Sequence, residues 1–391
     1  MLNPLENNKI KILIVHNKYR NFGGEDANLE EEIKLLSKFY DVSVLKFDNS
    51  DSFNLFTIFS FLLNSNLKSN KLLKDKIESF SPDYAYVHNT WFTANLGIFK
   101  ILKELNIKTY IKLHNFRLFC TNNYSKTNHL NSSTFCEMCG FDSKRSYIFN
   151  KYFIDSFLKS FLVVKYGKKY FKILQDNFFK LITLTNHQKK YFENISFVNK
   201  NINVLHNPIK FLNFDNLNYN PNSNFVVYVG RLTDEKGIDD LLSTWEKYNS
   251  SSLILLVIGT GNIEKKLKKK YKSYKVKFLG NLTLDKSLEY IRSSRAVITA
   301  TKMYEGQPRV LSEASSLGVP SIFPNFGGMP EFFPMKYKLT YKQYDYDSLL
   351  DKLYLLEDKK LLRKLSKEVY SYSKNKFSNE AVLEIYRKLF V

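Results

Sequence analysis

Cysteine is scarce in this chain, with three residues in 391. Three cysteines cannot form a disulfide framework, so the composition favours a reducing compartment, the cytoplasm. Internal repeats and low-complexity tracts are missing as well. The length instead predicts two domains of about 100–200 residues each, both with full hydrophobic cores.

Long apolar runs are also lacking. The most apolar stretch, residues 53–63, has about half of the ~20 residues needed to span a bilayer. We interpret it as a buried or surface helix, with a helix lying among lipid headgroups as the alternative. The N-terminus, Met1 to Glu6, lacks the basic-then-apolar order of a signal peptide, so we expect no export signal there.

Acidic side chains are in deficit: 38 Asp and Glu stand against 59 Lys and Arg, which gives a net charge of +21. Because 44% of the residues are hydrophobic, we expect a globular protein in spite of this charge. The excess predicts an anionic partner, which can be nucleic acid, an acidic membrane surface or a phosphate-bearing substrate.

What the sequence does have is an alternation of short β-branched runs with longer segments of helical spacing. This order predicts parallel βαβ units, that is, an α/β fold with helices on both faces of each sheet. A first set of strands is expected at 11–16, 42–45, 84–88, 109–114, 181–185 and 203–206. A second set is expected at 225–230, 252–259, 276–280, 296–300 and 320–323.

A stretch rich in Asn and Pro separates the two sets of strands. We therefore predict an N-terminal domain over 1–208, a linker over 209–223 and a C-terminal domain over 224–372. A closing helix over 373–391 either stays on the second domain or crosses back to the first. Such doubly wound domains bind ligands at the carboxyl ends of their strands.

Two glutamates lie near one of these expected strand ends. Glu305 falls in a Gly/Pro loop, and Glu313 falls inside the helix that follows it. Amides of such a loop and of a first helical turn can bind an anion or sugar hydroxyls. Glu313 can accept two hydrogen bonds from a vicinal diol. Taken alone, the pair is equally compatible with ordinary capping and surface carboxylates.

A second loop, from Gly230 to Gly237, joins a strand to a helix and carries Arg231 and Lys236. Two cations in this setting suit a diphosphate, because Arg can bind it through two hydrogen bonds and Lys adds a point charge. A solvated basic loop is the alternative. A third loop at an expected strand end is Gly327-Gly328-Met329-Pro330-Glu331.

Together these motifs resemble the retaining GT-B glycosyltransferases of family 4, the glycosyl transferases group 1. The matching residues are Gly230-Arg231-Leu232, Lys236-Gly237, Glu305, Glu313, Leu317-Gly318-Val319-Pro320 and Gly327 to Glu331. A looser match in the first half runs through Gly23-Gly24-Glu25, His88-Asn89 and His114-Asn115-Phe116-Arg117. The resemblance implies a GT-B fold: two Rossmann-like doubly wound domains facing each other across a cleft.

The resemblance also implies roles for individual residues. Glu305, which would bind the donor sugar, and His114, on the acceptor side, would be the catalytic residues. Arg231 and Lys236 would hold the donor diphosphate and neutralise the leaving group. The full donor-binding set would be Gly23, Gly24, Arg231, Lys236, Gly306, Gln307, Pro308, Arg309 and Glu313. Glu313 would bind the ribose, and the two glycines would let the backbone approach the diphosphate.

The activity implied is transfer of a sugar, with retention by front-face attack, from a nucleotide diphosphate donor to a growing bacterial surface glycan such as lipopolysaccharide or capsule. The acceptor would be lipid-linked and the enzyme hexosyltransferase-like, cytoplasmic and peripheral on the inner face of the membrane. No Asp-x-Asp occurs near an expected strand end, since Asp345-Tyr346-Asp347 lies in a late polar loop. Neither a metal nor another cofactor is therefore expected.

The sequence departs from the family pattern at a few positions. Ala300-Thr301-Lys302 replaces a small Pro-Ser pair that often precedes the tyrosine, and Arg309 and Ser312 stand where apolar residues are more usual. None of these changes removes a key functional group, so we expect an active enzyme.

The segment 151–190 interleaves lysines with Phe and Tyr. Its helical spacing favours an amphipathic surface attracted to anionic lipid over a nucleic-acid site in which the aromatics stack on bases. A merely solvated basic face is the third interpretation. The expected partners are therefore a nucleotide sugar, a glycan acceptor and an anionic membrane, and not nucleic acid.

Other signals carry less weight. Cys120, Cys136 and Cys139 can be read as a zinc loop with His114 or His129, but a fourth cysteine is missing and we favour free thiols. Gly259-Thr260-Gly261 lacks the third glycine of a dinucleotide-binding motif, so a nicotinamide cofactor is not expected.

Three rival functions stay open. A GT-B sugar-nucleotide epimerase would act on its donor without an acceptor. A phosphorylase would need a lysine-bound pyridoxal phosphate. A basic nucleic-acid-binding protein would lose its ligand as salt rises and would ignore nucleotide sugars.

Overall fold

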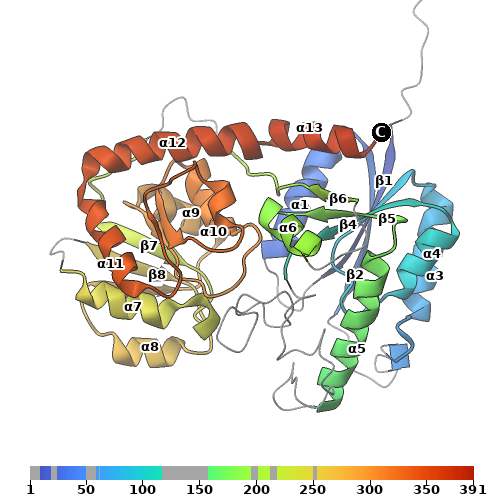
Figure 1. Cartoon of the computed structure of the whole chain (residues 1–391), viewed down its shortest axis with the longest axis horizontal. Helices are drawn as coiled ribbons and strands as arrows, with labels where there is room; N and C mark the ends of the chain where they lie inside the picture. The colour runs from blue at the N-terminus through green and yellow to red at the C-terminus, as the bar shows by residue number, and fades with distance from the viewer. Residues whose placement is uncertain are drawn as a thin grey trace, which may run out of the picture. The chain divides into compact units, whose positions relative to one another are not determined.

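The computed structural model describes residues 9–18, 24–49, 59–60, 62–116, 157–194, 201–211, 218–249 and 253–391. Within these ranges the chain divides into two compact units (Figure 1). The first unit comprises the described residues up to Pro208 together with Val382–Val391, and the second comprises those of Ile209–Ala381.

The first unit contains a six-stranded parallel sheet in the order β2-β1-β3-β4-β5-β6. Its strands are β1 (Lys11–Lys18), β2 (Asp41–Asp48), β3 (Tyr84–Val87), β4 (Lys108–Leu113), β5 (Phe179–Thr183) and β6 (Ile202–Val204). Its helices are α1 (Gly24–Leu36), α3 (Leu67–Phe80), α4 (Gly97–Glu104), α5 (Phe157–Leu174), α6 (Asn186–Asn194) and most of α13 (Asn379–Leu389). Each strand expected for this half is present, with ends shifted by a few residues.

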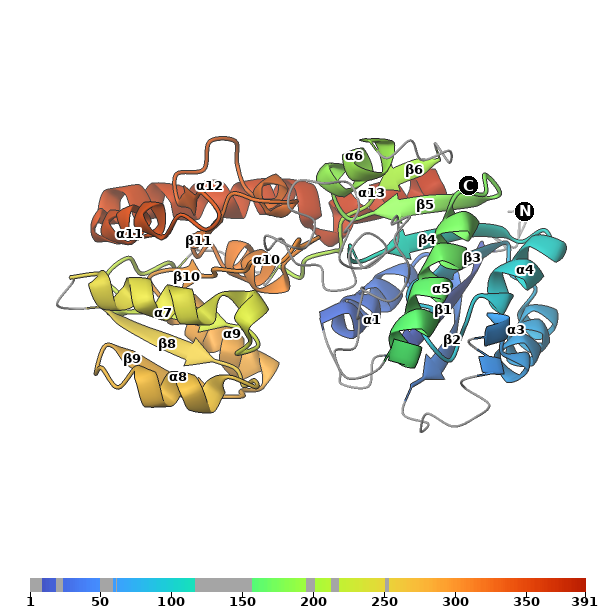
Figure 2. The ribbon, with the colours of Figure 1, turned by 60° about the horizontal axis from the view of Figure 1, so that its bottom comes forward.

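Both faces of the first sheet are covered by helices (Figures 1 and 2). Ile12 and Ile14 of β1 pack in one buried cluster with Leu29 of α1 and Tyr386 of α13. Because side chains alternate along a strand, Leu13 points to the opposite face, where α3 contacts β1. Burial on both faces explains the uninterrupted apolar runs at 12–15 in β1 and 84–87 in β3.

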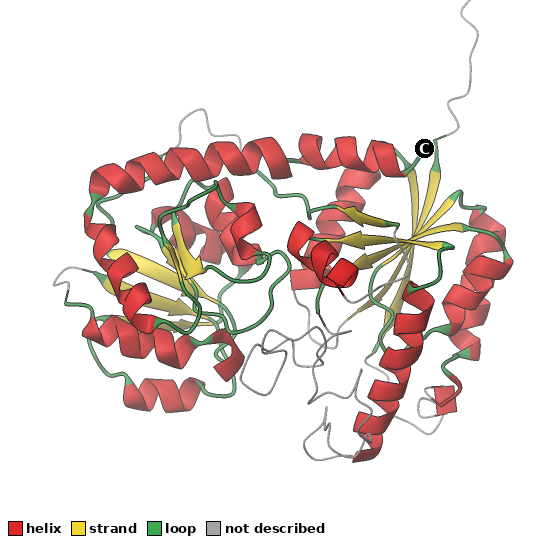
Figure 3. Cartoon of the chain, viewed as in Figure 1, coloured by secondary structure: helices red, strands yellow, loops and turns green. Residues whose placement is uncertain are grey.

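The second unit contains a six-stranded parallel sheet in the order β12-β11-β10-β7-β8-β9. Its strands are β7 (Phe225–Val229), β8 (Ile254–Ile258), β9 (Val276–Gly280), β10 (Val297–Ile298), β11 (Ser321–Pro324) and β12 (Thr340–Tyr341). Its helices are η2 (Asp234–Lys236), α7 (Ile238–Lys247), α8 (Glu264–Lys270), α9 (Leu284–Ser293), α10 (Arg309–Ser316), η3 (Met329–Phe332), α11 (Tyr346–Tyr354), η4 (Leu355–Glu357) and α12 (Lys359–Phe377). Figure 3 shows the helices of each unit around its strands.

The described part of the stretch that the sequence assigns to a linker, 209–223, packs into this second unit. Ile209 is buried in its core, and the Ile209 N–H donates to the Phe377 carbonyl oxygen over 2.8 Å. The Tyr219 hydroxyl donates to the carbonyl oxygen of Arg295 over 2.6 Å. Ile209 and Tyr219 thus anchor this segment to the second unit, although its Asn and Pro content predicts a linker.

The strand order reverses once in each sheet. In the first sheet the reversal lies between β1 and β3, and in the second it lies between β7 and β10. Ligands of open α/β sheets bind beyond the carboxyl ends of the strands at such a reversal. The loops that follow β7 and β10 are therefore the first place to look for a site in the second unit.

Two local expectations differ from the structure. The late polar loop at 345–347 is wrong, because Asp345 caps α11 by accepting a hydrogen bond from the Ser348 N–H over 2.9 Å. Asp is a preferred residue at that position. The closing element is divided, since residues 373–377 continue α12 and Ser378 separates it from α13.

The apolar stretch 53–63 is described only at 59–60 and 62–63, which are helical. Phe59 is 60% exposed and Leu63 is 70% exposed, so these residues form a surface helix rather than a buried one. Every described helix is too short or too polar to cross a membrane.

Candidate functional site

The reversal in the second sheet brings two sequence motifs into contact. Lys236 ends η2, in the loop after β7, and Glu305 lies in the loop after β10. The Lys236 Nζ atom is 2.5 Å from the Glu305 Oε1 atom, although the two residues are 69 positions apart. Their side chains are 23% and 21% exposed, so the pair is reachable from solvent but largely enclosed.

A glycine makes this approach possible. Gly237 has φ of +65°, and a Cβ atom there would come within 1.9 Å of the carbonyl oxygen of Ala300. The positive φ favours glycine, and the close contact excludes any side chain. The loop after β7 is thereby seated directly on the loop after β10.

Glu305 is oriented by a second contact. The Thr301 hydroxyl donates to Glu305 Oε1 over 3.2 Å, and Thr301 itself is buried. Gly327, from the third loop, packs near the Glu305 backbone, because a Cβ there would be 3.7 Å from the Glu305 carbonyl oxygen. The hydrogen bonds from Lys236 and Thr301 are both made to Oε1, so Oε2 is the oxygen that can accept a hydrogen bond from a ligand hydroxyl.

Arg231 offers a more exposed cation than Lys236. Its side chain is 66% exposed, and its Nη2 atom is 3.7 Å from Glu235 Oε1. The Arg231 carbonyl oxygen accepts a hydrogen bond from the Tyr228 hydroxyl over 3.0 Å, which fixes the backbone. An anchored backbone with a solvated guanidinium suits the capture of an incoming anion.

Glu313 lies on α10 and pairs with Arg309 on the preceding turn. The Arg309 Nε atom donates to Glu313 Oε1 over 2.6 Å. Burial raises the pKa of the Glu313 carboxyl, and Arg309 only partly offsets that effect. The arginine that departs from the family pattern therefore holds the carboxylate that the sequence assigned to the ribose.

The start of α10 supplies backbone donors. Pro308 precedes the helix and makes no side-chain cap, so it satisfies none of the first-turn N–H groups, which have no partner within the helix. Gly306 is buried, and the Gln307 Nε2 atom is 3.5 Å from the Ser312 hydroxyl. These residues directly follow Glu305 in the same loop.

The pair Gly259 and Gly261, which does not form a dinucleotide-binding motif, has a structural use. A Cβ at Gly259 would meet the Gly230 carbonyl oxygen at 2.0 Å, and one at Gly261 would meet the Leu232 carbonyl oxygen at 2.1 Å. The two glycines let the loop after β8 pack against the loop that carries Arg231.

Histidines gather at the corresponding edge of the first sheet. His16 lies on β1, His88 follows β3 and His114 follows β4, and these three strands are neighbours. The His88 Nδ1 and His114 Nε2 atoms are 2.8 Å apart, with the rings stacked at 5.1 Å. His16 Nε2 is 3.0 Å from Asp26 Oδ1.

These imidazoles are held neutral. Burial lowers the pKa of His88 and of His114 well below its usual value, and the nearby Lys112 ammonium lowers both further. In the sequence His88 stands out only as part of the looser family match, so its contact with His114 was missed. The signal that points to it is a histidine directly after each of two neighbouring parallel strands.

Other predicted residues are less informative here. Gly24 begins α1, and a Cβ there would meet no atom within 4 Å. Gly23, His129 and the three cysteines lie outside the described residues. Where side chains are described, no group of three or more His, Cys, Asp or Glu could hold a metal ion.

Comparison with known proteins finds a family match over the part of the chain that carries these loops. Residues 210–374 match the family model of glycosyl transferases group 1. The chain is 35% identical over 128 residues to the amylovoran biosynthesis glycosyltransferase AmsD of Erwinia amylovora, an alignment that covers 32% of this chain and 36% of AmsD. The match therefore spans about a third of the length of that relative.

Solved structures cover nearly the whole chain. Sucrose-phosphate synthase of Thermosynechococcus elongatus superposes with a TM-score of 0.69 at 15% identity, covering 98% of this chain and 99% of that one. HepE of Anabaena, solved with UDP-glucose, superposes with a TM-score of 0.62 at 15% identity, covering 97% and 99%. The chain has the GT-B fold. At these identities the likeness establishes the fold and leaves the chemistry to the residues of the site.

Proposed function

We propose that this chain is a retaining glycosyltransferase that moves a sugar from a nucleotide diphosphate donor to a growing, lipid-linked bacterial surface glycan. The observation that carries the proposal is the contact of Lys236 with Glu305 where the second sheet reverses its strand order. The family match over 210–374 includes both residues, and AmsD is named for the biosynthesis of amylovoran.

Cations of the second unit would stabilise the leaving group. Glycosyl transfer develops positive charge on the sugar and negative charge on the departing diphosphate. Lys236 and Arg231 would meet that negative charge, and preorganised charges act most strongly where the transition state needs them. The start of α10 would add backbone donors to the phosphate.

Two carboxylates would bind the sugar and the ribose of the donor. Glu305, with Oε1 held by Lys236 and Thr301, would accept a hydrogen bond from a sugar hydroxyl on Oε2. Glu313 would accept hydrogen bonds from the ribose diol, oriented by Arg309. HepE, whose structure contains UDP-glucose, supports a nucleotide sugar as the ligand of such a fold.

His114 would contact the reacting sugar as a neutral imidazole, since burial lowers its pKa well below the usual value. A neutral ring can donate one hydrogen bond and accept another, so it would orient a hydroxyl rather than supply a positive charge. His114→Ala should lower turnover more than donor binding.

Metal independence is part of the proposal, because the cationic side chains would do the work of a divalent ion. Activity should then persist in excess EDTA and should not rise when Mg²⁺ or Mn²⁺ is added back. A strict requirement for either ion would remove this part of the proposal.

Transfer is tested with single variants of the two loops. Glu305→Ala and Lys236→Ala should each abolish release of nucleoside diphosphate from a donor panel supplied with lipid-linked glycan acceptors. Lys266→Ala is the matched control, because its ammonium is exposed and pairs with Asp239 instead of Glu305. Wild-type turnover in the Lys236/Glu305 double variant would refute the assignment, and donor turnover without an acceptor would favour an epimerase.

The first unit also has a surface suited to an anionic membrane. An exposed apolar corner is formed by Leu62, Leu63 and Leu67, with Leu67 84% exposed. The Lys165 Nζ atom on α5 donates to the Leu62 carbonyl oxygen over 3.3 Å, which brings α5 beside this corner. Residues 59–74 and 157–175 carry eight lysines and no acidic residue. Leucines framed by lysines are complementary to an anionic lipid surface, and such docking would hold the protein on the inner face of the membrane.

Vesicle binding tests this surface. The full chain should sediment with vesicles that contain phosphatidylglycerol and stay in solution with pure phosphatidylcholine. Leu63→Glu and Lys165→Glu should each weaken sedimentation, whereas Leu284→Glu, on an exposed helix of the second unit, should not. Equal sedimentation of all three variants would contradict the proposal.

A further inference from the structure

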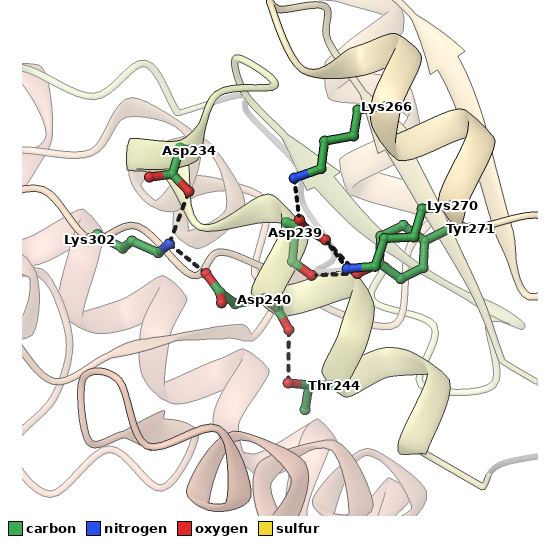
Figure 4. Close-up of polar contacts among 8 residues, drawn as sticks. All are labelled: Asp234, Asp239, Asp240, Thr244, Lys266, Lys270, Tyr271 and Lys302. Carbon is green, nitrogen blue, oxygen red and sulfur yellow. Dashed lines mark hydrogen bonds and ion pairs between the residues drawn. The ribbon is translucent and has the colours of Figure 1, made fainter.

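Lys302 is a buried lysine beside the candidate site that neither the family resemblance nor the proposed reaction uses. Its side chain is 9% exposed and lies in the loop after β10, three residues before Glu305. The Lys302 Nζ atom is 2.6 Å from Asp240 Oδ2 and 3.4 Å from Asp234 Oδ1 (Figure 4). A buried ammonium has to be compensated by such carboxylates.

The backbone of Lys302 contributes a further contact. Its N–H donates to the Glu235 carbonyl oxygen over 2.9 Å. Lys302 therefore holds the short helix η2 at Asp234 and Glu235 and also holds the start of α7 at Asp240. The next residue of η2 is Lys236, whose ammonium reaches Glu305 on the same loop as Lys302.

The charge on Lys302 is maintained at neutral pH. Burial by itself lowers the pKa of this amine, but the Asp240 and Asp234 carboxylates outweigh it and raise the pKa above its usual value. The contacts of Lys302 are therefore ion pairs through the whole physiological range. The chain has Lys302 where the family pattern that it resembles often has a small residue.

We propose that Lys302 is a positioning residue that ties η2 to the loop after β10 and so fixes the distance between Lys236 and Glu305. The tether itself follows from the contacts alone. Its consequence for a diphosphate ligand rests on the function proposed above. A displacement of about 1 Å in a positioned group can cost up to about a hundredfold in activity.

Asp239, the residue next to Asp240, provides a control for the role of the Lys302 ion pairs. Asp239 accepts a hydrogen bond from Lys270 Nζ over 2.8 Å and one from the Tyr271 hydroxyl over 2.5 Å, and both partners belong to α8 or its end (Figure 4). The two aspartates are neighbours on α7 and both form ion pairs. Only the Asp240 network reaches the loop that carries Glu305.

The experiment compares Lys302→Met and Asp240→Asn with the matched controls Lys270→Met and Asp239→Asn. Hydrogen exchange on the full chain should show faster exchange of the amides of 230–237 in the first two variants and no change there in the controls. Titration with UDP, and with inorganic pyrophosphate as a probe that carries no base, should show about tenfold weaker binding in the first two variants only. Lys302→Arg, which keeps the charge, should recover part of that loss.

Each outcome is decisive. Unchanged exchange at 230–237 in Lys302→Met would overturn the tether, whatever the ligand. Equal loss of binding in Asp240→Asn and Asp239→Asn would mean that general destabilisation, and not positioning, is responsible. Faster exchange in a protein whose wild-type form binds neither pyrophosphate nor any of a panel of nucleoside diphosphates would uphold the tether and refute the proposed function.

Discussion

Single side chains handle charge differently in the two units. In the second unit Lys236 and Arg231 keep their charges within reach of solvent. In the first unit His88 is 2% exposed and loses its charge instead, because burial lowers its pKa. The first arrangement suits an anionic ligand, and the second suits hydrogen bonding to a neutral one.

The buried histidines predict a loss of stability in acid. Below about pH 6.5 the unfolded chain binds protons that the folded chain excludes, so stability falls as the pH falls, by about 1.4 kcal/mol per pH unit for each such histidine. His88→Gln should reduce this slope while leaving stability at pH 8 less affected. Urea unfolding at pH 8, 6.5 and 5.5 measures it, and an unchanged slope in the variant would contradict the neutral state of His88.

Comparing Gly237 with Gly280 separates the effect of steric contact on stability from the effect of backbone strain. Both have positive φ, +65° and +72°, but a Cβ at Gly237 meets the Ala300 carbonyl oxygen at 1.9 Å and one at Gly280 meets no atom within 4 Å. Gly280→Ala should therefore cost about 1–2 kcal/mol, the usual penalty for a left-handed conformation.

Gly237→Ala should lower the free energy of unfolding by clearly more than Gly280→Ala, because the loop after β7 has to move off the loop after β10. It should also weaken binding of the donor, since Lys236 moves with that loop. Chemical unfolding of both variants is the measurement. Equal losses of stability would show that the close approach at Gly237 is unimportant.

At the scale of elements, α13 is joined to the first sheet through a buried ion pair. Lys112 Nζ on β4 is 2.6 Å from Glu32 Oε1 on α1, and neither side chain is exposed. The Tyr86 hydroxyl donates to the same oxygen over 2.9 Å, and the hydroxyl of Tyr386 on α13 donates to it as well. One carboxylate therefore connects a strand pair with two helices.

Lys112→Met should destabilise the first unit by about 3–5 kcal/mol, because it leaves Glu32 buried without its counter-charge. Adding Glu32→Gln to that variant should recover part of the loss. Lys34→Met is the matched control: Lys34 pairs with Glu31 at the exposed surface of the same helix, and its loss should change the free energy of unfolding little, because exposed ion pairs are screened by solvent. Urea unfolding that shows similar losses for both lysines would contradict this account.

The elements were predictable where local pattern decides them. The strand expected at 276–280 is found at Val276–Gly280, since a β-branched and aromatic run between polar turns has few other solutions. The helix at 346–354 was missed, because its first turn looks like polar loop sequence until Asp345 is recognised as its cap. Its burial depends on packing against α7, which no local pattern encodes.

The sequence predicted which residues belong to the candidate site, but it did not predict which of them are in contact. Glu305, Lys236 and Glu313 were chosen from motif spacing, and the structure brings the first two together. The partners of Lys302 and His88 are far apart in the sequence or sit on neighbouring strands, so only the fold reveals them. Long-range polar pairs of this kind leave no periodic signal.

At the scale of the whole molecule, the net charge of +21 has more than one use. Lys236 and Arg231 account for the part that would face a diphosphate. The lysines of 59–74 and 157–175 account for the part that would face lipid. The fold places these groups in different units, so a variant of one set should leave the function of the other intact.

The central claim is that the loops after β7 and β10 bind a nucleotide diphosphate sugar. Calorimetric titration of the full chain with a panel of nucleotide sugars, beginning with UDP-glucose, tests it most directly. We predict that at least one donor binds the wild-type protein and that Lys236→Ala weakens this donor by about tenfold to a hundredfold, the loss of one charge-assisted hydrogen bond. Absence of binding by every donor, or equal affinity in Lys236→Ala, would contradict the account.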